Sequence, residues 1–308
     1  MSYAVLFPGQ GSQSVEMCPD VRERRTDLLG RAANDVLGWN LDRMISQGPA
    51  EELLKTQHAQ PALYATSFAL WSEFSDAVEV PPSAGAGHSL GEYTALAAAE
   101  VFSYVDGLAL VARRGLAMAD AAEHTSSGMA ALIGADLETA EDVASRRRSN
   151  GGDLYVANIN APGQIVVAGG TDDIEWLVAN ARDQGIRRAI VLKVAGGFHS
   201  PFMAPAAAAL SEALEGVTMR RAQFTVYANV SAEPTTDPHR TLSEQLTAPV
   251  RFSETLSAIA ASGVDTFIHI GPGDVTAGLA KRTVDGATIH VVSTIDEARE
   301  VASVVSVQ

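Results

Sequence analysis

Residues 84–93 read AGAGHSLGEY, and this short stretch decides the class of fold. Four small residues suited to a buried strand run into a turn at Ser89, and helix-forming residues begin directly after it. Residues 87–91, GHSLG, fit the pattern G-x-S-x-G, in which a serine sits on a sharp turn between a strand and a helix. Glycines on both sides let the two backbones pass closely. Strand, sharp turn and helix in this order indicate an α/β protein.

The sequence on both sides extends this pattern. Residues 3–7 are an unbroken apolar run, which is typical of a strand that helices cover on both faces. Further strands are predicted over residues 224–228, 266–270 and 289–293, and helices over residues 20–37, 60–74, 106–122 and 250–262. Alternating strands and helices of this kind predict a parallel sheet between two layers of helices.

A second pattern interrupts the first between residues 128 and 194. It predicts a strand, a helix, two strands, a helix and a strand over residues 129–135, 137–148, 155–160, 165–169, 172–184 and 189–194. The order βαββαβ is the split unit of a ferredoxin-like fold. Because the larger α/β pattern continues on both sides, we predict a large subdomain from residues 1–127 and 195–308 and an inserted small subdomain over residues 128–194.

Ser89 on the predicted turn is a candidate nucleophile, and its hydroxyl needs a base. Of the seven histidines, His199 lies just past a strand end, where α/β proteins gather catalytic groups. His88 adjoins the serine on a turn that makes neighbouring side chains diverge, and His269 and His290 lie in apolar strands, so structural roles are expected. Strand-end acids follow His199 in the chain, which favours a Ser-His dyad or a base oriented by a backbone carbonyl. A serine that only caps the helix fits the same motif.

A glycine-rich loop and a helical arginine complete the candidate residues. The loop FPGQGSQ, residues 7–13, has Ser14 where a dinucleotide-binding loop has its third glycine. We expect its backbone N–H groups to form an oxyanion hole with that of Leu90. Arg114 has apolar helical neighbours, where a guanidinium is costly unless it meets a carboxylate. Snorkelling at the helix edge explains the same pattern, so the sequence leaves both readings of Arg114 open.

Composition excludes several classes of protein. The chain has 308 residues, with 22 Lys and Arg against 37 Asp and Glu, and its net charge of −15 argues against binding along nucleic acid. The single cysteine, Cys18, excludes an internal disulfide and fits a reducing compartment. The first residues lack the features of a signal peptide, and no run approaches the ~20 apolar residues of a membrane span. We therefore expect a cytoplasmic protein without nucleic-acid or membrane partners.

Seven segments in register resemble the malonyl-CoA:acyl carrier protein transacylases and the discrete or modular acyltransferases of polyketide synthases. They are FPGQGSQ (7–13), QGPAEELLKTQHAQPAL (47–63), GHSLGEYTAL (87–96), LVARRGLAM (110–118), NINAPGQIVVAG (158–169), GGFHSPFM (196–203) and GPGDVTAGLAKR (271–282). They follow the family's order and cover nearly the whole chain. The resemblance implies an α/β-hydrolase-like large subdomain with a parallel sheet and an inserted ferredoxin-like small subdomain.

The resemblance also implies roles for individual residues. Ser89 matches the acylated nucleophile, His199 the base, and Arg114 the arginine that pairs bidentately with a malonyl carboxylate. The backbone N–H groups of Gln10 and Leu90 match the oxyanion hole.

A pocket of four residues and one backbone carbonyl are implied as well. The expected substrate pocket includes Phe198, Gly197, His88 and Asn160, and the carbonyl that orients the base is expected at Arg251. Phe198 matches a pattern in which a bulky residue blocks an α-methyl branch. Gly197 stands where most relatives have alanine, which would leave one methyl less near the site.

The implied activity is transfer of a malonyl group from malonyl-CoA to the phosphopantetheine thiol of an acyl carrier protein, by ping-pong kinetics through a malonyl-serine. We expect a monomer without a metal or a tightly bound cofactor. Alternatives are an acyltransferase for an α-substituted malonyl extender, a thioesterase-like hydrolase, and a non-catalytic carrier-protein scaffold. Since carrier proteins of such systems are acidic, basic clusters at residues 146–148, 187–188 and 281–282 are candidates for docking, although most could be solvated faces.

Overall fold

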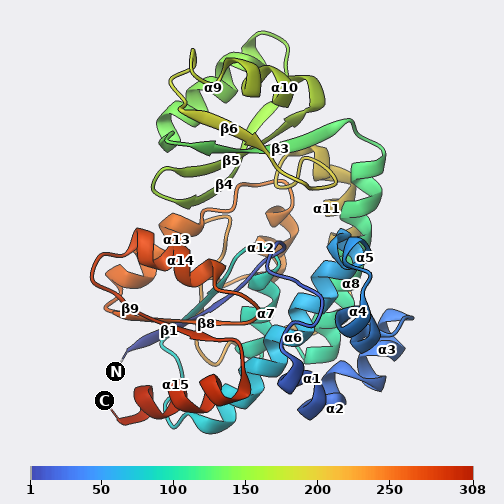
Figure 1. Ribbon diagram of the computed structural model, residues 1–308, viewed down its shortest axis with the longest axis vertical. Coiled ribbons are helices and arrows are strands. Elements are labelled where there is room, and N and C mark those ends of the chain that lie inside the picture. The colour runs from blue at the N-terminus through green and yellow to red at the C-terminus, as the bar shows by residue number, and fades with distance from the viewer. Residues whose placement is uncertain (1, 308) are drawn as a thin grey trace.

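The computed structural model describes residues 2–307 and contains two sheets of different kinds (Figure 1). The strands of the larger sheet are β1 (Tyr3–Phe7), β2 (Ala84–Gly87), β7 (Thr225–Val226), β8 (Thr266–Ile270) and β9 (Thr288–Val292). They lie in the order β7-β2-β1-β8-β9, and every neighbouring pair is parallel. The predicted parallel sheet is confirmed.

Helices cover both faces of this sheet. Successive residues of each strand point to opposite sides, so the apolar strands present apolar side chains on both faces. In β1, Val5 belongs to one hydrophobic core and Leu6 to another. The Val5 core is packed by α6 (Thr56–Ala77), α7 (Gly91–Ala98), α8 (Tyr104–Glu123), α11 (Ala204–Glu215) and α15 (Ile295–Val307). The Leu6 core is packed by α13 (Phe252–Ala261) and α14 (Val275–Thr283).

The smaller sheet has the predicted ferredoxin-like order. Its strands are β3 (Ser127–Ile133), β4 (Leu154–Ala161), β5 (Gln164–Gly170) and β6 (Arg188–Val191), and its helices are α9 (Leu137–Ser149) and α10 (Thr171–Asn180). The spatial order is β4-β5-β3-β6, with every pair antiparallel, and the helices share one core with the sheet. The subdomain bounds 1–127, 128–194 and 195–308 remain our prediction.

Two predicted helices differ clearly from the structure. The helix predicted over residues 20–37 is three short helices, because the backbone leaves the helical region at Arg25 (φ −103°, ψ 48°) and at Gly30 (φ −97°, ψ −124°). Helix α6 begins before its predicted start, so Pro61 lies inside the helix and not in its first turn. Helix α15 was not predicted. The remaining helices are α1 (Pro19–Arg24), α2 (Thr26–Leu29), α3 (Arg31–Leu37), α4 (Leu41–Gln47), α5 (Ala50–Leu54), α12 (Pro238–Gln245) and the 3₁₀ turn η1 (Pro201–Met203).

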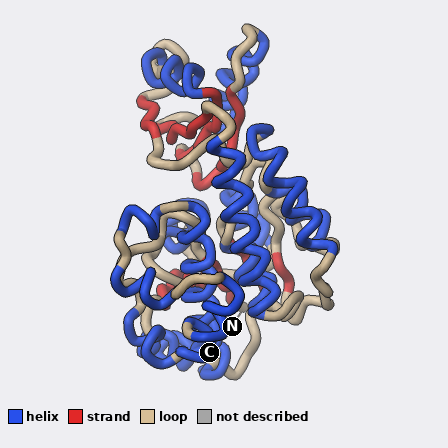
Figure 2. The backbone as a smooth tube through the Cα atoms, turned by 90° about the vertical axis from the view of Figure 1, so that its right-hand side faces the viewer, coloured by secondary structure: helices blue, strands red, loops and turns tan. Residues whose placement is uncertain are grey.

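The two sheets lie at different levels of the molecule, with the smaller one at one end (Figure 2). Helix α8 ends at Glu123, and strand β3 begins at Ser127, so this long helix leads directly from the large sheet's helices into the small sheet. Among residues 2–307, no helix has the length and apolar character needed to cross a bilayer.

Candidate active site

Ser89 lies on the sharp turn between β2 and α7. Its φ of 53° is in the left-handed region, which residues with a Cβ rarely adopt. The flanking glycines are required by close backbone contacts. A Cβ on Gly87 would lie 1.8 Å from the carbonyl carbon of Gly91, and a Cβ on Gly91 would lie 2.2 Å from the carbonyl oxygen of Phe7. The G-x-S-x-G pattern therefore has the steric cause that the sequence predicted.

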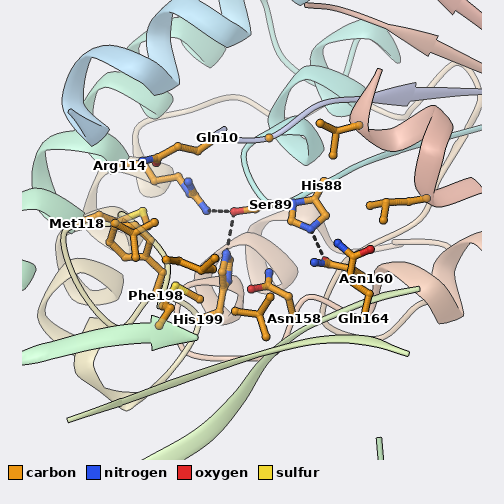
Figure 3. Close-up of a pocket in the computed structure, with 17 residues that line it drawn as sticks. Gln10, His88, Ser89, Arg114, Met118, Asn158, Asn160, Gln164, Phe198 and His199 are labelled. Carbon is orange, nitrogen blue, oxygen red and sulfur yellow. Dashed lines mark hydrogen bonds between the residues drawn. The ribbon is translucent and has the colours of Figure 1, made fainter. Parts of the chain in front are cut away.

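His199 faces the serine. The distance from Ser89 Oγ to His199 Nε2 is 2.7 Å (Figure 3). The other ring nitrogen, Nδ1, lies 2.9 Å from the backbone carbonyl oxygen of Gln245. Because a carbonyl only accepts hydrogen bonds, Nδ1 carries the proton and Nε2 is left free to accept the serine proton. The two residues form the predicted dyad geometry, with a backbone carbonyl as the third group.

The prediction of the residue that supplies this carbonyl was wrong. We predicted Arg251, but the carbonyl is that of Gln245. Arg251 precedes α13, and its carbonyl oxygen accepts the backbone N–H of Thr255 at 2.9 Å in the first turn of that helix. Its guanidinium bonds Glu254. Arg251 is thus engaged in starting α13 and does not contact His199.

Arg114 is buried, which decides between the two readings that the sequence left open. Its side chain is 1% exposed, so it does not snorkel to solvent. Nη1 donates to Gln60 Oε1 at 2.7 Å, and Nη2 donates to Gln245 Oε1 at 3.0 Å and to Ser89 Oγ at 3.0 Å. The guanidinium also lies over the ring of Tyr93, 5.4 Å from the ring centroid. Within residues 2–307 no carboxylate forms a salt bridge with it.

The charges of the site keep the base in its reactive form. Burial, and next the positive charge of Arg114, lower the pKa of His199 from 6.5 to about 3. His199 is therefore neutral at neutral pH and can accept a proton. Burial also lowers the pKa of Arg114, although a guanidinium stays charged. The site thus holds a permanent cation beside a neutral base.

A cavity of about 210 Å³ opens onto these groups, between the two sheets (Figure 3). The larger part contributes Ser89, His199 and Arg114, and also Gln10, Met118 and Phe198. The smaller part contributes Met129, Asn158, Asn160 and Gln164. An acyl group bound here would contact both parts.

Three of the four residues expected in the pocket line this cavity. Phe198, Asn160 and His88 do so, and His88 Nε2 lies 2.7 Å from Asn160 Oδ1. Burial lowers the pKa of His88. The expectation for Gly197 was wrong, because a Cβ there would point at Phe202 Cδ2, 3.0 Å away, and at Ser127 Cβ, 3.3 Å away. The methyl group of an alanine at position 197 would therefore pack against neighbouring side chains and would not enter the cavity.

The backbone donors expected for the oxyanion hole belong to neighbouring segments. The glycine-rich loop lies against the serine turn so closely that a Cβ on Gly9 would be 2.4 Å from the carbonyl oxygen of His88. In the part of the chain that the structure describes, the backbone N–H groups of Gln10 and Leu90 donate no hydrogen bond. Two free donors beside the nucleophile are what an oxyanion hole requires.

Four polar residues behind the serine were missed in the sequence. Asn229 accepts the N–H of Ser89 at 2.8 Å and donates to the carbonyl of Gly87 at 2.7 Å, which fixes both ends of the turn. Gln60, Glu92 and Gln245 connect Arg114 and His199 to the same region. Gln60, Glu92 and Gln245 are buried polar residues of the helices α6, α7 and α12, and such isolated polar positions are the one signal that the sequence offered for them.

A half-buried serine with a tautomer-fixed histidine, on a strand-to-helix turn of a parallel sheet, defines an acyl-transfer enzyme of the α/β class. The family model of the acyl transferase domain matches residues 5–305, and the chain belongs to this family of acyltransferases. It is 42% identical to the malonyl CoA-acyl carrier protein transacylase of Bacillus subtilis, over 91% of this chain and 89% of that one. The protein of the same name from Escherichia coli K12 is 36% identical, over 93% of this chain and 94% of its own.

Solved structures agree with these relatives. The malonyl CoA-acyl carrier protein transacylase of Coxiella burnetii superposes with a TM-score of 0.94 at 28% identity, covering 99% of this chain and 98% of that chain. A malonyl-transacylase in complex with a type II polyketide synthase acyl-carrier protein superposes with a TM-score of 0.93 at 35% identity, covering 98% and 99%. The predicted fold class and family resemblance are confirmed.

Proposed function

We propose that the protein transfers a malonyl group from malonyl-CoA to the phosphopantetheine thiol of an acyl carrier protein, through a malonyl-serine at Ser89. The observation that carries this proposal is the buried Arg114, which points at Ser89 Oγ from 3.0 Å and has neutral amides as its other hydrogen-bond partners. A buried cation without a direct salt bridge favours a substrate with a free carboxylate. The names of the relatives agree with this substrate.

The first half of the reaction forms the acyl-enzyme. Ser89 Oγ attacks the thioester carbonyl carbon while its proton passes to His199 Nε2, 2.7 Å away. The negative charge that develops on the carbonyl oxygen is placed at the backbone N–H groups of Gln10 and Leu90. The carbon–sulfur bond then breaks, and the departing CoA sulfur takes the proton from His199.

The second half repeats these steps with a different thiol. His199 Nε2 takes the proton of the phosphopantetheine thiol, and the sulfur attacks the ester carbonyl of malonyl-Ser89. The serine oxygen leaves and recovers the proton from His199. Both half-reactions use the same groups in opposite order, so the kinetics are ping-pong.

The acyl-enzyme is tested directly by intact-protein mass spectrometry after malonyl-CoA is added. The wild type gains the mass of a malonyl group, and Ser89→Ala does not. Ser149→Ala, an exposed serine on α9, is the matched control and labels like the wild type. Labelling of Ser89→Ala would overturn the assignment, and faster release of acetate than of malonate from the corresponding thioesters would favour a hydrolase.

We propose malonyl in preference to an α-substituted malonyl group. Phe198 and Met118 both line the cavity beside His199 and leave little room for a branch at the α-carbon. Competition of malonyl-CoA with methylmalonyl-CoA and ethylmalonyl-CoA measures this selectivity. Preference for a branched thioester would contradict it.

We also propose that the enzyme acts as a monomer in the cytoplasm and holds no tightly bound cofactor. The free thiol of buried Cys18 fits a reducing compartment. Cell fractionation and light scattering of the purified protein test the first two statements. Full activity of metal-free protein after dialysis against a chelator tests the third.

A further inference from the structure

Glu92 is a buried carboxyl group directly behind the nucleophile that the proposed reaction does not use. It belongs to α7 and is 0% exposed. Its Oε2 accepts the backbone N–H of Asn229 at 3.0 Å and the side-chain amide Nε2 of Gln245 at 2.8 Å. A buried carboxyl group without a salt bridge is costly and calls for a role that outweighs the cost.

Gln245 connects this carboxyl group to the site. Its Nε2 donates to Glu92 Oε2 and, at 3.0 Å, to the carbonyl oxygen of Ser89. Its Oε1 accepts from Arg114 Nη2 at 3.0 Å. The neighbours of Nε2, which include Asn229 Oδ1 at 3.4 Å, are all acceptors and the neighbour of Oε1 is a donor, so only one orientation of the amide satisfies these contacts.

We propose that Glu92 is a positioning residue of the carboxylate clamp, which holds the Gln245 amide in the orientation that fixes the Arg114 guanidinium. This inference rests on the proposed role of Arg114 in binding the malonyl carboxylate. If the amide turned over, its carbonyl would face the oxygens of Glu92 and Ser89, and its NH₂ group would face the guanidinium. Glu92 makes this alternative orientation unfavourable.

The charges of Glu92 and Arg114 also favour this arrangement of the clamp. Burial lowers the pKa of Arg114, and the negative charge of Glu92 opposes this shift; burial raises the pKa of Glu92, and the positive charge of Arg114 opposes that shift. Where Glu92 is ionised, above a pH of about 7, it compensates part of the buried charge of Arg114 without forming the direct salt bridge that would compete with the substrate carboxylate. The clamp stays both charged and available.

A double-mutant cycle tests the connection. Glu92→Met and Gln245→Met retain unbranched side chains of similar size and the Gln245 backbone carbonyl on which His199 depends. Since a hydrogen bond to a charged group is worth about one factor of ten or more, each variant should raise KM for malonyl-CoA roughly tenfold. The double variant should match the single variants, because Glu92 acts through Gln245.

Two further measurements separate positioning from a merely structural role. Labelling of Ser89 by an uncharged fluorophosphonate needs no clamp and should fall much less than malonyl transfer in all three variants. Glu92→Gln keeps an acceptor for Gln245 and should recover most of the affinity. Glu123→Met, at an exposed position of α8, is the control.

Additive effects in the cycle, or equal losses of malonyl transfer and fluorophosphonate labelling, would overturn the inference. If Glu92→Met does not fold, the test compares Gln245→Met with the double variant Glu92→Gln/Gln245→Met. Once Gln245 has lost its amide, adding Glu92→Gln should not change KM for malonyl-CoA any further. An Arg114→Ala variant with the wild-type KM for malonyl-CoA would instead refute the proposed function. If Arg114→Ala raises KM while Gln245→Met does not, only the inference about Glu92 fails.

Discussion

Arg114 Nη2 and His199 Nε2 meet at one atom, Ser89 Oγ, at 3.0 Å and 2.7 Å. The hydroxyl oxygen accepts from the guanidinium and donates its proton to the imidazole. Before substrate binds, the Arg114 guanidinium, which is proposed to bind the malonyl carboxylate, is thus hydrogen-bonded to the nucleophile itself. The carboxylate of the substrate must take over this donor, so carboxylate recognition and release of Ser89 for attack are one event.

This geometry predicts a selective defect in Arg114 variants. Arg114→Ala and Arg114→Lys should both lower kcat/KM for malonyl-CoA by roughly a hundredfold, because two charge-assisted hydrogen bonds are lost or cannot be made bidentate. Transfer of an acetyl group, which has no carboxylate, should fall far less. Arg113→Ala is the matched control, since Arg113 is exposed on the same helix. Equal losses for malonyl and acetyl would mean that Arg114 does not bind the carboxylate.

The dyad predicts an unusual pH profile. Because the pKa of His199 is lowered to about 3, the imidazole stays neutral when the pH falls, and the rate of fluorophosphonate labelling should be flat from neutral pH down to about pH 5. The charge of Arg114 contributes to this lowering, so Arg114→Ala should raise the pKa of His199 and move the acidic limb to higher pH. An acidic limb near pH 6.5 in the wild type would contradict the buried, neutral base.

The sequence predicted those features that depend on neighbours in the chain. The turn at Ser89 needs Gly87 and Gly91 for steric reasons that act within a few residues. The βαββαβ order follows from local periodicity, and both of these short-range signals agree with the structure. The strand predicted to end just before His199 ends earlier, at Val191, and belongs to the small antiparallel sheet.

Features that depend on contacts across the chain were missed or wrong. The Gln245 amide meets Glu92 across 153 residues, and no local pattern relates the two. Any residue can supply a backbone carbonyl, so the sequence held nothing to distinguish Gln245 from Arg251. The direction of the Cβ at Gly197 depends on the path of its loop, which places Phe202 and Ser127 on that side.

The correction at Gly197 leads to a prediction about selectivity. Phe198→Ala should raise the ratio of kcat/KM for methylmalonyl-CoA over malonyl-CoA by roughly tenfold, because it enlarges the cavity. Gly197→Ala should leave this ratio unchanged, since its methyl group would meet Phe202. Phe202→Ala is the control for loss of a nearby aromatic ring. A change in selectivity with Gly197→Ala would show that this position does face the substrate.

Burial of Glu92 predicts a pH-dependent stability. Burial raises the pKa of Glu92 from 4.5 to about 7, so the folded protein holds this proton more tightly than the unfolded chain. The contribution is fully present below pH 4.5 and is lost as the pH rises through about 7. The free energy of unfolding of the wild type, relative to Glu92→Gln, should therefore decrease between these pH values in urea titrations. A pH-independent difference would place the pKa of folded Glu92 near its ordinary value.

The net charge of −15 makes docking of an acidic carrier protein depend on local basic groups. Of the candidate clusters, residues 146–148 are already engaged, with Arg147 2.6 Å from Asp173 and Arg148 over the ring of Tyr155. Arg187, Arg188, Lys281 and Arg282 are exposed and form no salt bridge within residues 2–307. They lie on or beside β6 and α14, the elements that lead to cavity residues Leu192 and Leu279.

Charge reversal at these two pairs, Arg187→Glu/Arg188→Glu and Lys281→Glu/Arg282→Glu, should therefore weaken transfer to the carrier protein several-fold, and more at low salt than at high salt, because screening reduces the added repulsion. Self-acylation by malonyl-CoA should survive. Arg146→Glu, in the engaged cluster on α9, is the control and should have a smaller effect. Stopped-flow measurement of each half-reaction at two ionic strengths distinguishes these outcomes, and an equal loss of both half-reactions would refute docking at these residues.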